Sequence, residues 1–363
     1  MKILKPIFIL AFLISAGSVS AQIGGRHIYD FLNLTPSARL VSLGGVNVST
    51  FDDDLNFGVQ NPALVNDSMH KQVSLSFSNY LAGINYGYAG YSHSFEGIGS
   101  FHSGIQYVNS GQMQGADEFG NLTQTFAANE VAWYVGGSRA WQQFRYGANL
   151  KFISSTLAPG YTSAGLALDL GGSYIGKKGL FSAGLVVKNV GVQLSTYTGT
   201  GGREPLPFEI VAGVSNKLQY MPLRFSVTMI QLEHPNLIFN DPNRVPEFNL
   251  DGTEVKPPNQ TVDRIFRHFV FGAEFLLGKA LRLRAGYNHL RRQELKSENR
   301  GSFTGFSLGA GIRAKRFAFD YGYTSFGVNS AFNVHQLSLK LNLKKSEARS
   351  RPEALPDSDK KDP

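Results

Sequence analysis

The stretch from Leu337 to Lys344, which reads Leu-Ser-Leu-Lys-Leu-Asn-Leu-Lys, alternates one apolar with one polar residue over its whole length. Successive side chains of a β-strand point to opposite faces, so this stretch places four leucines on one face and the polar residues on the other. Segments 143–154 and 281–290 repeat the pattern, with Phe, Tyr and Leu on one face and Arg, Asn, Lys and Gly on the other. The pattern predicts long amphipathic strands.

Segments of this kind follow one another from residue 71 to residue 344. We predict strands at 71–80, 84–95, 99–109, 129–141, 143–154, 163–175, 180–190, 208–218, 221–232, 265–277, 281–290, 303–313, 316–325 and 337–344. A strand of about eleven residues, at roughly 3.3 Å per residue and tilted by about 40°, rises roughly 28 Å, close to the apolar band of a membrane barrel. A soluble sandwich would also alternate, but its charged face would meet bulk water. We therefore predict an all-β fold, a fourteen-stranded antiparallel transmembrane β-barrel over residues 71–344.

The connections between these strands are short and long by turns. After even-numbered strands they are short, at 96–98, 142, 176–179, 219–220, 278–280 and 314–315. After odd-numbered strands they are long, at 110–128, 155–162, 191–207, 233–264, 291–302 and 326–332, with 81–83 as the exception. Because outer-membrane barrels keep short turns in the periplasm, we expect both termini on the periplasmic side and the long loops outside.

The first residues indicate export. Lys2 and Lys5 precede an apolar run from Ile7 to Ile14, and small residues precede Gln22, which together predict a signal peptide over residues 1–21. The run of about eight apolar residues is too short to span a bilayer as a helix. The predicted location is the outer membrane, and the polar residues 345–363 are expected to form a disordered periplasmic tail.

Residues 22–70 are irregular and rich in Gly, Asn and Asp. A segment of this size before the first strand fits the polar lumen of the barrel, where its backbone can bond to inward Arg, Asp and Asn side chains. We expect it to form an N-terminal luminal plug. The residues of the expected plug motif are Ser37, Ala38, Arg39, Gly44, Gly45, Asn61, Pro62 and Ala63.

These motifs, followed by the aromatic segments 76–80 and 84–89, resemble the PorV- and PorQ-like barrels of the type IX secretion system. The resemblance implies an anchor without catalytic activity, part of an attachment complex with a PorZ-like surface protein and a PorU-like sortase as partners. A looser Gly-Gly and Asn-Pro-Ala pattern is also similar to the fatty-acid-transporter-like barrels. That wider group implies fourteen strands, a plug and passage of hydrophobic small molecules.

The loop 233–263 is the candidate partner-binding surface. It has six acidic residues against two basic ones, and five prolines that favour a preordered backbone. The candidate residues are Asp241, Arg244, Glu247, Asp251 and Glu254. A solvated loop without a partner is the alternative interpretation.

Several site classes receive no support. The chain has no cysteine, its eight histidines form no HExxH pair, and no motif marks an activated serine, so we expect no metal, no cofactor and no catalytic residue. The formal charge of +8 is spread without a basic run, which argues against nucleic-acid binding.

We expect Asp52, Asp53 and Asp54 to cap a turn or pair with luminal arginines. Strand carboxylates are likewise expected to form luminal salt bridges, with Asp169, Glu209, Glu274 and Asp320 facing Arg145, Arg224, Arg282 and Arg284.

Two functions from different classes follow. The first is the secretion anchor, and the alternative is a channel for hydrophobic small molecules. The channel requires an apolar luminal site, and the sequence shows no luminal cluster of apolar residues.

Overall fold

A computed structural model describes residues 27–79, 83–238, 261–278, 280–295, 303–327 and 333–343. The predicted signal peptide 1–21, most of the acidic loop and the tail 345–363 lie outside the described residues. No helix within the described ranges is long and apolar enough to cross a bilayer.

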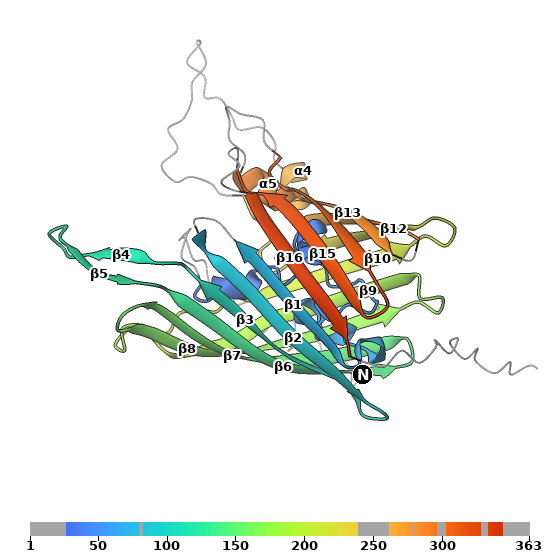
Figure 1. Cartoon of the computed structure of the whole chain (residues 1–363), viewed down its shortest axis with the longest axis horizontal. Helices are drawn as coiled ribbons and strands as arrows, with labels where there is room; N and C mark the ends of the chain where they lie inside the picture. The colour runs from blue at the N-terminus through green and yellow to red at the C-terminus, as the bar shows by residue number, and fades with distance from the viewer. Residues whose placement is uncertain are drawn as a thin grey trace, which may run out of the picture.

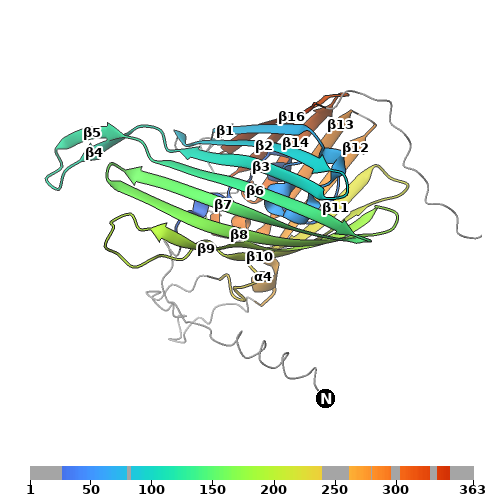
Figure 2. The ribbon, with the colours of Figure 1, turned by 90° about the horizontal axis from the view of Figure 1, so that it is seen from below.

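Fourteen antiparallel strands close into one barrel, as Figures 1 and 2 show from two sides. They are β1 (Gln72–Asn79), β2 (Asn85–Phe95), β3 (Gly99–Asn109), β6 (Asn129–Trp141), β7 (Phe144–Ala158), β8 (Tyr161–Ile175), β9 (Phe181–Ser195), β10 (Glu209–Lys217), β11 (Leu223–Met229), β12 (Phe269–Leu277), β13 (Leu281–Asn288), β14 (Phe306–Arg313), β15 (Phe317–Ser325) and β16 (Asn333–Asn342). Closure joins the first strand to the last, with Leu75 of β1 opposite Leu339 of β16. The predicted fold class is confirmed.

The two faces of the wall differ as the alternation predicts. On β16, Leu337 is 44% exposed on the outer face, whereas Ser338 and Lys340 are buried on the inner face. On β1, Leu75 and Phe77 point outward while Ser76 is buried. An apolar outer surface and a polar inner one are the arrangement that a barrel in lipid requires.

The structure corrects several predicted boundaries. β7 extends to Ala158 and β8 already begins at Tyr161. The predicted long loop 155–162 is therefore a short turn. β9 continues to Ser195, and β16 begins four residues before Leu337. Ser155, Thr156 and Thr162 interrupt the apolar alternation, which explains the missed ends of β7 and β8. The end of β9 does alternate, with Val192 and Leu194 on the outer face, and the prediction there was simply too short.

Predicted loops also contain secondary structure. Residues 110–128 form a separate two-stranded hairpin of β4 (Met113–Ala116) and β5 (Leu122–Phe126), which projects well beyond the barrel wall (Figure 1). Short helices α4 (Thr261–Phe266) and α5 (His289–Leu295) lie in the connections that follow β11 and β13.

Residues 27–70 lie inside the barrel, and we call them the luminal segment (Figure 2). The segment consists of short turns of helix: η1 (Asp30–Asn33), α2 (Ala38–Ser42), α3 (Phe57–Gln60), η2 (Pro62–Leu64) and η3 (Asp67–Met69). α2 packs against β13, β14, β15 and β16, and η2 packs against β6, β7 and β8. Whether the segment acts as a plug, in the sense of blocking passage, stays a prediction.

Glycines in the wall allow this close packing. A Cβ atom on Gly286 would lie 2.2 Å from the backbone nitrogen of Gly44, and one on Gly322 would lie 2.3 Å from the carbonyl oxygen of Ala38. Gly172, by contrast, faces open space on the outer side of β8. Inward glycines therefore mark where the luminal segment touches the wall.

A Gly286→Leu variant should lose this contact, because a side chain there overlaps the backbone of the luminal segment. We expect the free energy of unfolding to fall by about 1–3 kcal/mol, measured as a lower urea midpoint for the heat-modifiable electrophoretic mobility of the barrel. Gly172→Leu is the matched control and should leave the midpoint unchanged. Equal midpoints for the two variants would contradict the packing described.

Candidate functional site in the lumen

Arg39 is the central charge of the lumen. It lies in α2, whose first turn is capped by the Ser37 side chain accepting from the Leu40 backbone. Its guanidinium donates to both oxygens of Glu274 on β12 at 2.9 Å, to Asp52 at 2.6 Å and to Asp54 at 3.0 Å. The Arg39 side chain is 2% exposed. One buried cation thus joins two parts of the luminal segment to the wall.

Further ion pairs extend from these carboxylates. Arg224 contacts Asp52 at 2.8 Å and Glu274 at 3.0 Å, and Arg284 contacts Glu274 at 2.9 Å. The other pairs are Arg284 with Asp320 at 2.6 Å, Lys340 with Asp54 at 2.8 Å and Arg313 with Asp53 at 2.9 Å. Together the network holds five cations (Arg39, Arg224, Arg284, Arg313, Lys340) and five carboxylates (Asp52, Asp53, Asp54, Glu274, Asp320).

This arrangement, which we call the ionic network, is neutral as a whole. Buried charges persist only when paired, and removing one partner leaves an uncompensated charge. The network therefore fixes α2 and residues 52–54 against six consecutive strands, β11 to β16. The prediction that the three aspartates pair with luminal arginines is confirmed.

The other predicted motif residues also meet the wall. Asn61 donates to the Val48 carbonyl at 2.8 Å and to Ser173 on β8 at 3.2 Å, and its side chain accepts from the Ala63 backbone. The Gly44 nitrogen donates to Ser307 of β14 at 3.0 Å, and both Gly44 and Gly45 have positive φ. The positive φ values explain the glycine pair, because other residues rarely adopt that conformation.

The predicted strand salt bridges are partly correct. Glu274 and Asp320 pair with Arg224 and Arg284 as expected. Asp169 instead pairs with Lys151 at 2.8 Å, and Glu209 with Lys188 at 3.4 Å. Arg145 and Arg282 donate to backbone carbonyls. Partner choice depends on the cross-strand register, which the sequence pattern does not give.

An apolar cluster lies in the part of the lumen along β2, β3 and β6 to β8, and here the prediction that no such cluster exists is wrong. Its wall residues occupy inward positions of β2, β3, β6, β7 and β8. The members are Tyr86, Tyr88, Val108, Ala132, Tyr134, Ile153 and Ala167 from these strands, Leu206 from a loop, and Ile28, Tyr29, Phe31, Leu32 and Val59 from the luminal segment. We call this set the luminal apolar cluster.

The tyrosines of the luminal apolar cluster satisfy their hydroxyl groups internally. Tyr134 donates to the Tyr88 hydroxyl at 2.5 Å, and the Tyr86 hydroxyl accepts from Gln106 at 3.0 Å. Their rings therefore present apolar faces to the segment without unpaired polar groups. The sequence pattern did not predict this cluster, because tyrosine occurs on both faces of these strands.

A cavity of about 90 Å³ adjoins the luminal apolar cluster. Tyr86 belongs to both, Leu34 lines the cavity and packs against the cluster, and the remaining lining comes mainly from β15, β16 and residues 33–41. The candidate loop residues Asp241, Arg244, Glu247, Asp251 and Glu254 lie outside the described residues.

No model of a protein family matches the chain, and no curated protein matches it in sequence. Solved structures do match. The toluene transporter TodX of Pseudomonas putida has 11% identity and a TM-score of 0.50, covering 85% of this chain and 97% of that one. The monoaromatic hydrocarbon channel CymD has 14% identity and a TM-score of 0.48, covering 87% and 99%. A FadL homologue of Pseudomonas aeruginosa has 10% identity and a TM-score of 0.48, covering 85% and 99%. At 11% identity the likeness to TodX shows a shared fold, a closed β-barrel.

An Arg39→Met variant should destabilise the barrel strongly, because the carboxylates of Asp52, Asp54 and Glu274 lose a cationic partner in a buried place. We expect a loss of about 3–5 kcal/mol in the free energy of unfolding, measured by urea titration in detergent. Arg264→Met, at an exposed position of α4, is the control and should change the value by less than about 0.5 kcal/mol. A midpoint for Arg39→Met equal to that of the control would refute the role of the ionic network.

Proposed function

We propose that this barrel passes hydrophobic small molecules through the outer membrane without catalysis. The observation that carries the proposal is the luminal apolar cluster. A water-filled pore has a polar interior, whereas an apolar site with a few satisfied polar groups is typical of pockets that bind small apolar ligands. The shared fold with the toluene transporter TodX supports the same class of function.

The luminal apolar cluster is occupied by side chains of the luminal segment, so passage requires these to move. Residues 28–32 are held by neutral contacts: the Ile28 nitrogen donates to the Pro205 carbonyl at 3.1 Å, and the Tyr29 and Ser163 hydroxyls lie 2.5 Å apart. Residues 38–54 are held by the charged ionic network instead. Neutral hydrogen bonds contribute about 0.5–1.5 kcal/mol each, less than bonds to charged groups. The start of the segment is therefore the part that moves.

A reversible covalent lock tests this proposal. The chain has no cysteine, so Ile28→Cys with Pro205→Cys introduces one disulfide between two backbones that already touch. Uptake of radiolabelled toluene by cells lacking other hydrocarbon channels is the measurement. We expect uptake by the wild-type chain, loss of uptake in the oxidised variant, and recovery after reduction.

The single variants Ile28→Cys and Pro205→Cys are the matched controls and should transport with or without reductant. Absence of uptake by the wild-type chain would refute the channel. Unchanged uptake in the oxidised double variant would refute the moving segment.

The second candidate is the secretion anchor, with PorZ-like and PorU-like proteins as partners. The β4–β5 hairpin favours it, because the hairpin projects beyond the barrel wall (Figure 1) and its residues Phe119 and Leu122 are 82% and 76% exposed. The hairpin turn is ordered: Asp117 accepts from the Asn121 side chain at 2.9 Å and from two backbone nitrogens, and these bonds lower the pKa of Asp117. An ordered projection that exposes large apolar side chains such as Phe119 and Leu122 suits contact with another protein.

Replacing residues 113–126 by a short Gly-Ser linker should abolish partner recovery if the hairpin anchors a surface protein. The measurement is affinity purification in mild detergent from a bacterium with type IX secretion. The double variant Phe119→Ser with Leu122→Ser should have the same effect without altering hairpin length. Full recovery with both variants would remove the hairpin from the anchoring proposal.

A further inference from the structure

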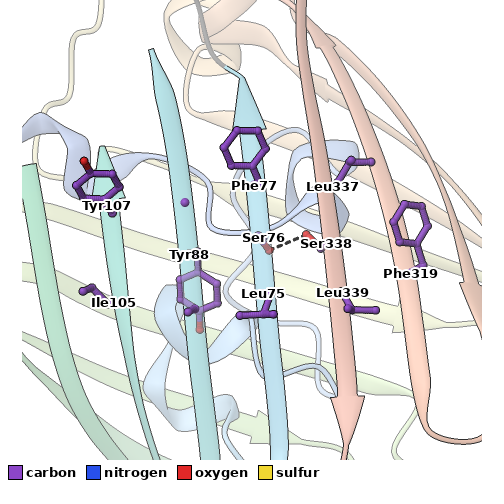
Figure 3. Close-up of a pocket in the computed structure, with 12 residues that line it drawn as sticks. Leu75, Ser76, Phe77, Tyr88, Ile105, Tyr107, Phe319, Leu337, Ser338 and Leu339 are labelled. Atoms are coloured by element: carbon purple, nitrogen blue, oxygen red, sulfur yellow. Dashed lines mark hydrogen bonds between the residues drawn. The ribbon is translucent and has the colours of Figure 1, made fainter. Parts of the chain in front are cut away.

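A hollow lies on the outer face of the barrel wall, where β1, β2 and β3 meet (Figure 3). Its volume is about 410 Å³. Phe77 and Leu75 of β1 stand on one side, and Tyr107 and Ile105 of β3 stand on the other. Leu337, Leu339 and Phe319 of the neighbouring strands extend the first side.

The hollow exists because the middle strand carries small residues. In the cross-strand register Gly87 lies between Phe77 and Tyr107, and Ala89 lies between Leu75 and Ile105. A Cβ atom added to Gly87 would meet nothing within 4 Å. Two consecutive rows therefore have a large residue on each side and a small one in the middle. We call the resulting groove the β2 furrow.

One end of the β2 furrow is closed by a large residue. Tyr91, the next outward residue of β2, is 40% exposed. The distance from Asn85 to Tyr91 along the strand is six residues, or about 20 Å. A furrow of this length inside the lipid-facing band fits a single acyl chain better than a bulky side chain of another protein.

The other end opens onto a row of four asparagines. Asn79 pairs with Asn85, Asn85 with Asn109, and Asn109 with Asn129, so β1, β2, β3 and β6 each contribute one. All four occupy outward positions, and none is buried. The Asn109 and Tyr107 side chains both donate to Asn129, at 2.6 and 2.8 Å. We call this row the asparagine ladder.

The asparagine ladder indicates the chemistry of the lipid head. A side-chain amide both donates and accepts hydrogen bonds, as hydroxyl groups require, whereas a phosphate is bound by Arg, Lys or backbone N–H groups. The ladder and the row beneath it (Phe77, Gly87, Tyr107, Val131) contain no charged residue. The ladder lies at the end of the barrel that carries the long hairpin loop, which the loop lengths assign to the outer leaflet.

We propose that the β2 furrow and the asparagine ladder form a binding site for one glycolipid of the outer leaflet. Its acyl chain lies on Gly87 and Ala89, and its sugar hydroxyl groups bond to Asn79 and Asn85. The furrow is part of the lipid-facing surface, so its occupant is a lipid chain, and the neutral ladder selects a sugar head over a phosphate head. The site lies outside the lumen and does not depend on the proposed channel.

Two detergents with the same dodecyl chain and different heads serve as probes. Dodecyl maltoside has a disaccharide head and dodecylphosphocholine has a phosphate head. Each is titrated into the full mature chain, held in a short-chain polyoxyethylene detergent, and bound molecules are counted by native mass spectrometry. We expect one retained dodecyl maltoside, bound about tenfold more tightly than dodecylphosphocholine.

Gly87→Leu fills the β2 furrow without a clash and should weaken dodecyl maltoside binding about tenfold or more. Gly172→Leu, outward on β8 with equally open space, is the matched control and should bind as the wild type does. Asn79→Ala with Asn85→Ala should remove the preference for the sugar head while the chain still binds. Thr162→Ala, a polar rim residue of β8, is the control for that pair.

Three results would overturn the proposal. They are no retained dodecyl maltoside on the wild type, equal affinity for both probes, and undiminished binding by Gly87→Leu. Folding of each variant is checked by its heat-modifiable mobility. If Gly87→Leu does not fold, the asparagine pair decides, because an unchanged head preference there would also overturn the site.

Discussion

Lipid offers no hydrogen bonds to a peptide backbone, and this constraint governs the whole molecule. It requires every strand to be paired, so β1 must meet β16 and the sheet must close. Closure in turn sends alternate side chains into a common lumen. Much of the inward set is polar or charged, and it stays buried because the luminal segment supplies opposite charges and hydrogen-bonding groups. The outer set is apolar and meets lipid directly.

The lumen divides into two parts with different energetics. Along β11 to β16 the ionic network binds α2 and residues 52–54 through charge-assisted bonds, which are costly to break. Along β2 to β8 the start of the luminal segment packs on aromatic and aliphatic side chains with few polar contacts. A ligand of matching polarity could replace those side chains. A fixed half and an exchangeable half are compatible with a channel that stays folded while its passage opens.

Much of the fold followed from the sequence, because the two-residue period reports directly on a surface with lipid on one side. Strand positions such as 99–109 and 129–141 agree with the structure. The sequence also identified Arg39, Asn61 and the three aspartates as motif residues of the luminal segment. It did not reveal the ends of β7 and β8, where Ser155, Thr156 and Thr162 interrupt the apolar alternation, the end of β9, or which cation each carboxylate meets. The luminal apolar cluster escaped notice because Tyr86, Tyr88 and Tyr134 lie inward among outward aromatic residues. The β2 furrow needed the register of three strands, which no single segment contains.

Accessibility along one strand tests the central claim most directly. The chain has no cysteine, so single cysteines can be placed one at a time from 334 to 341 on β16 in membrane vesicles. Each is labelled with a fluorophore and exposed to a quencher that is confined to lipid. Strong quenching at odd positions such as 337 and 339, with little at even positions such as 338 and 340, is the result expected for a closed barrel in lipid. Equal quenching of both sets, or quenching of neither, would contradict it.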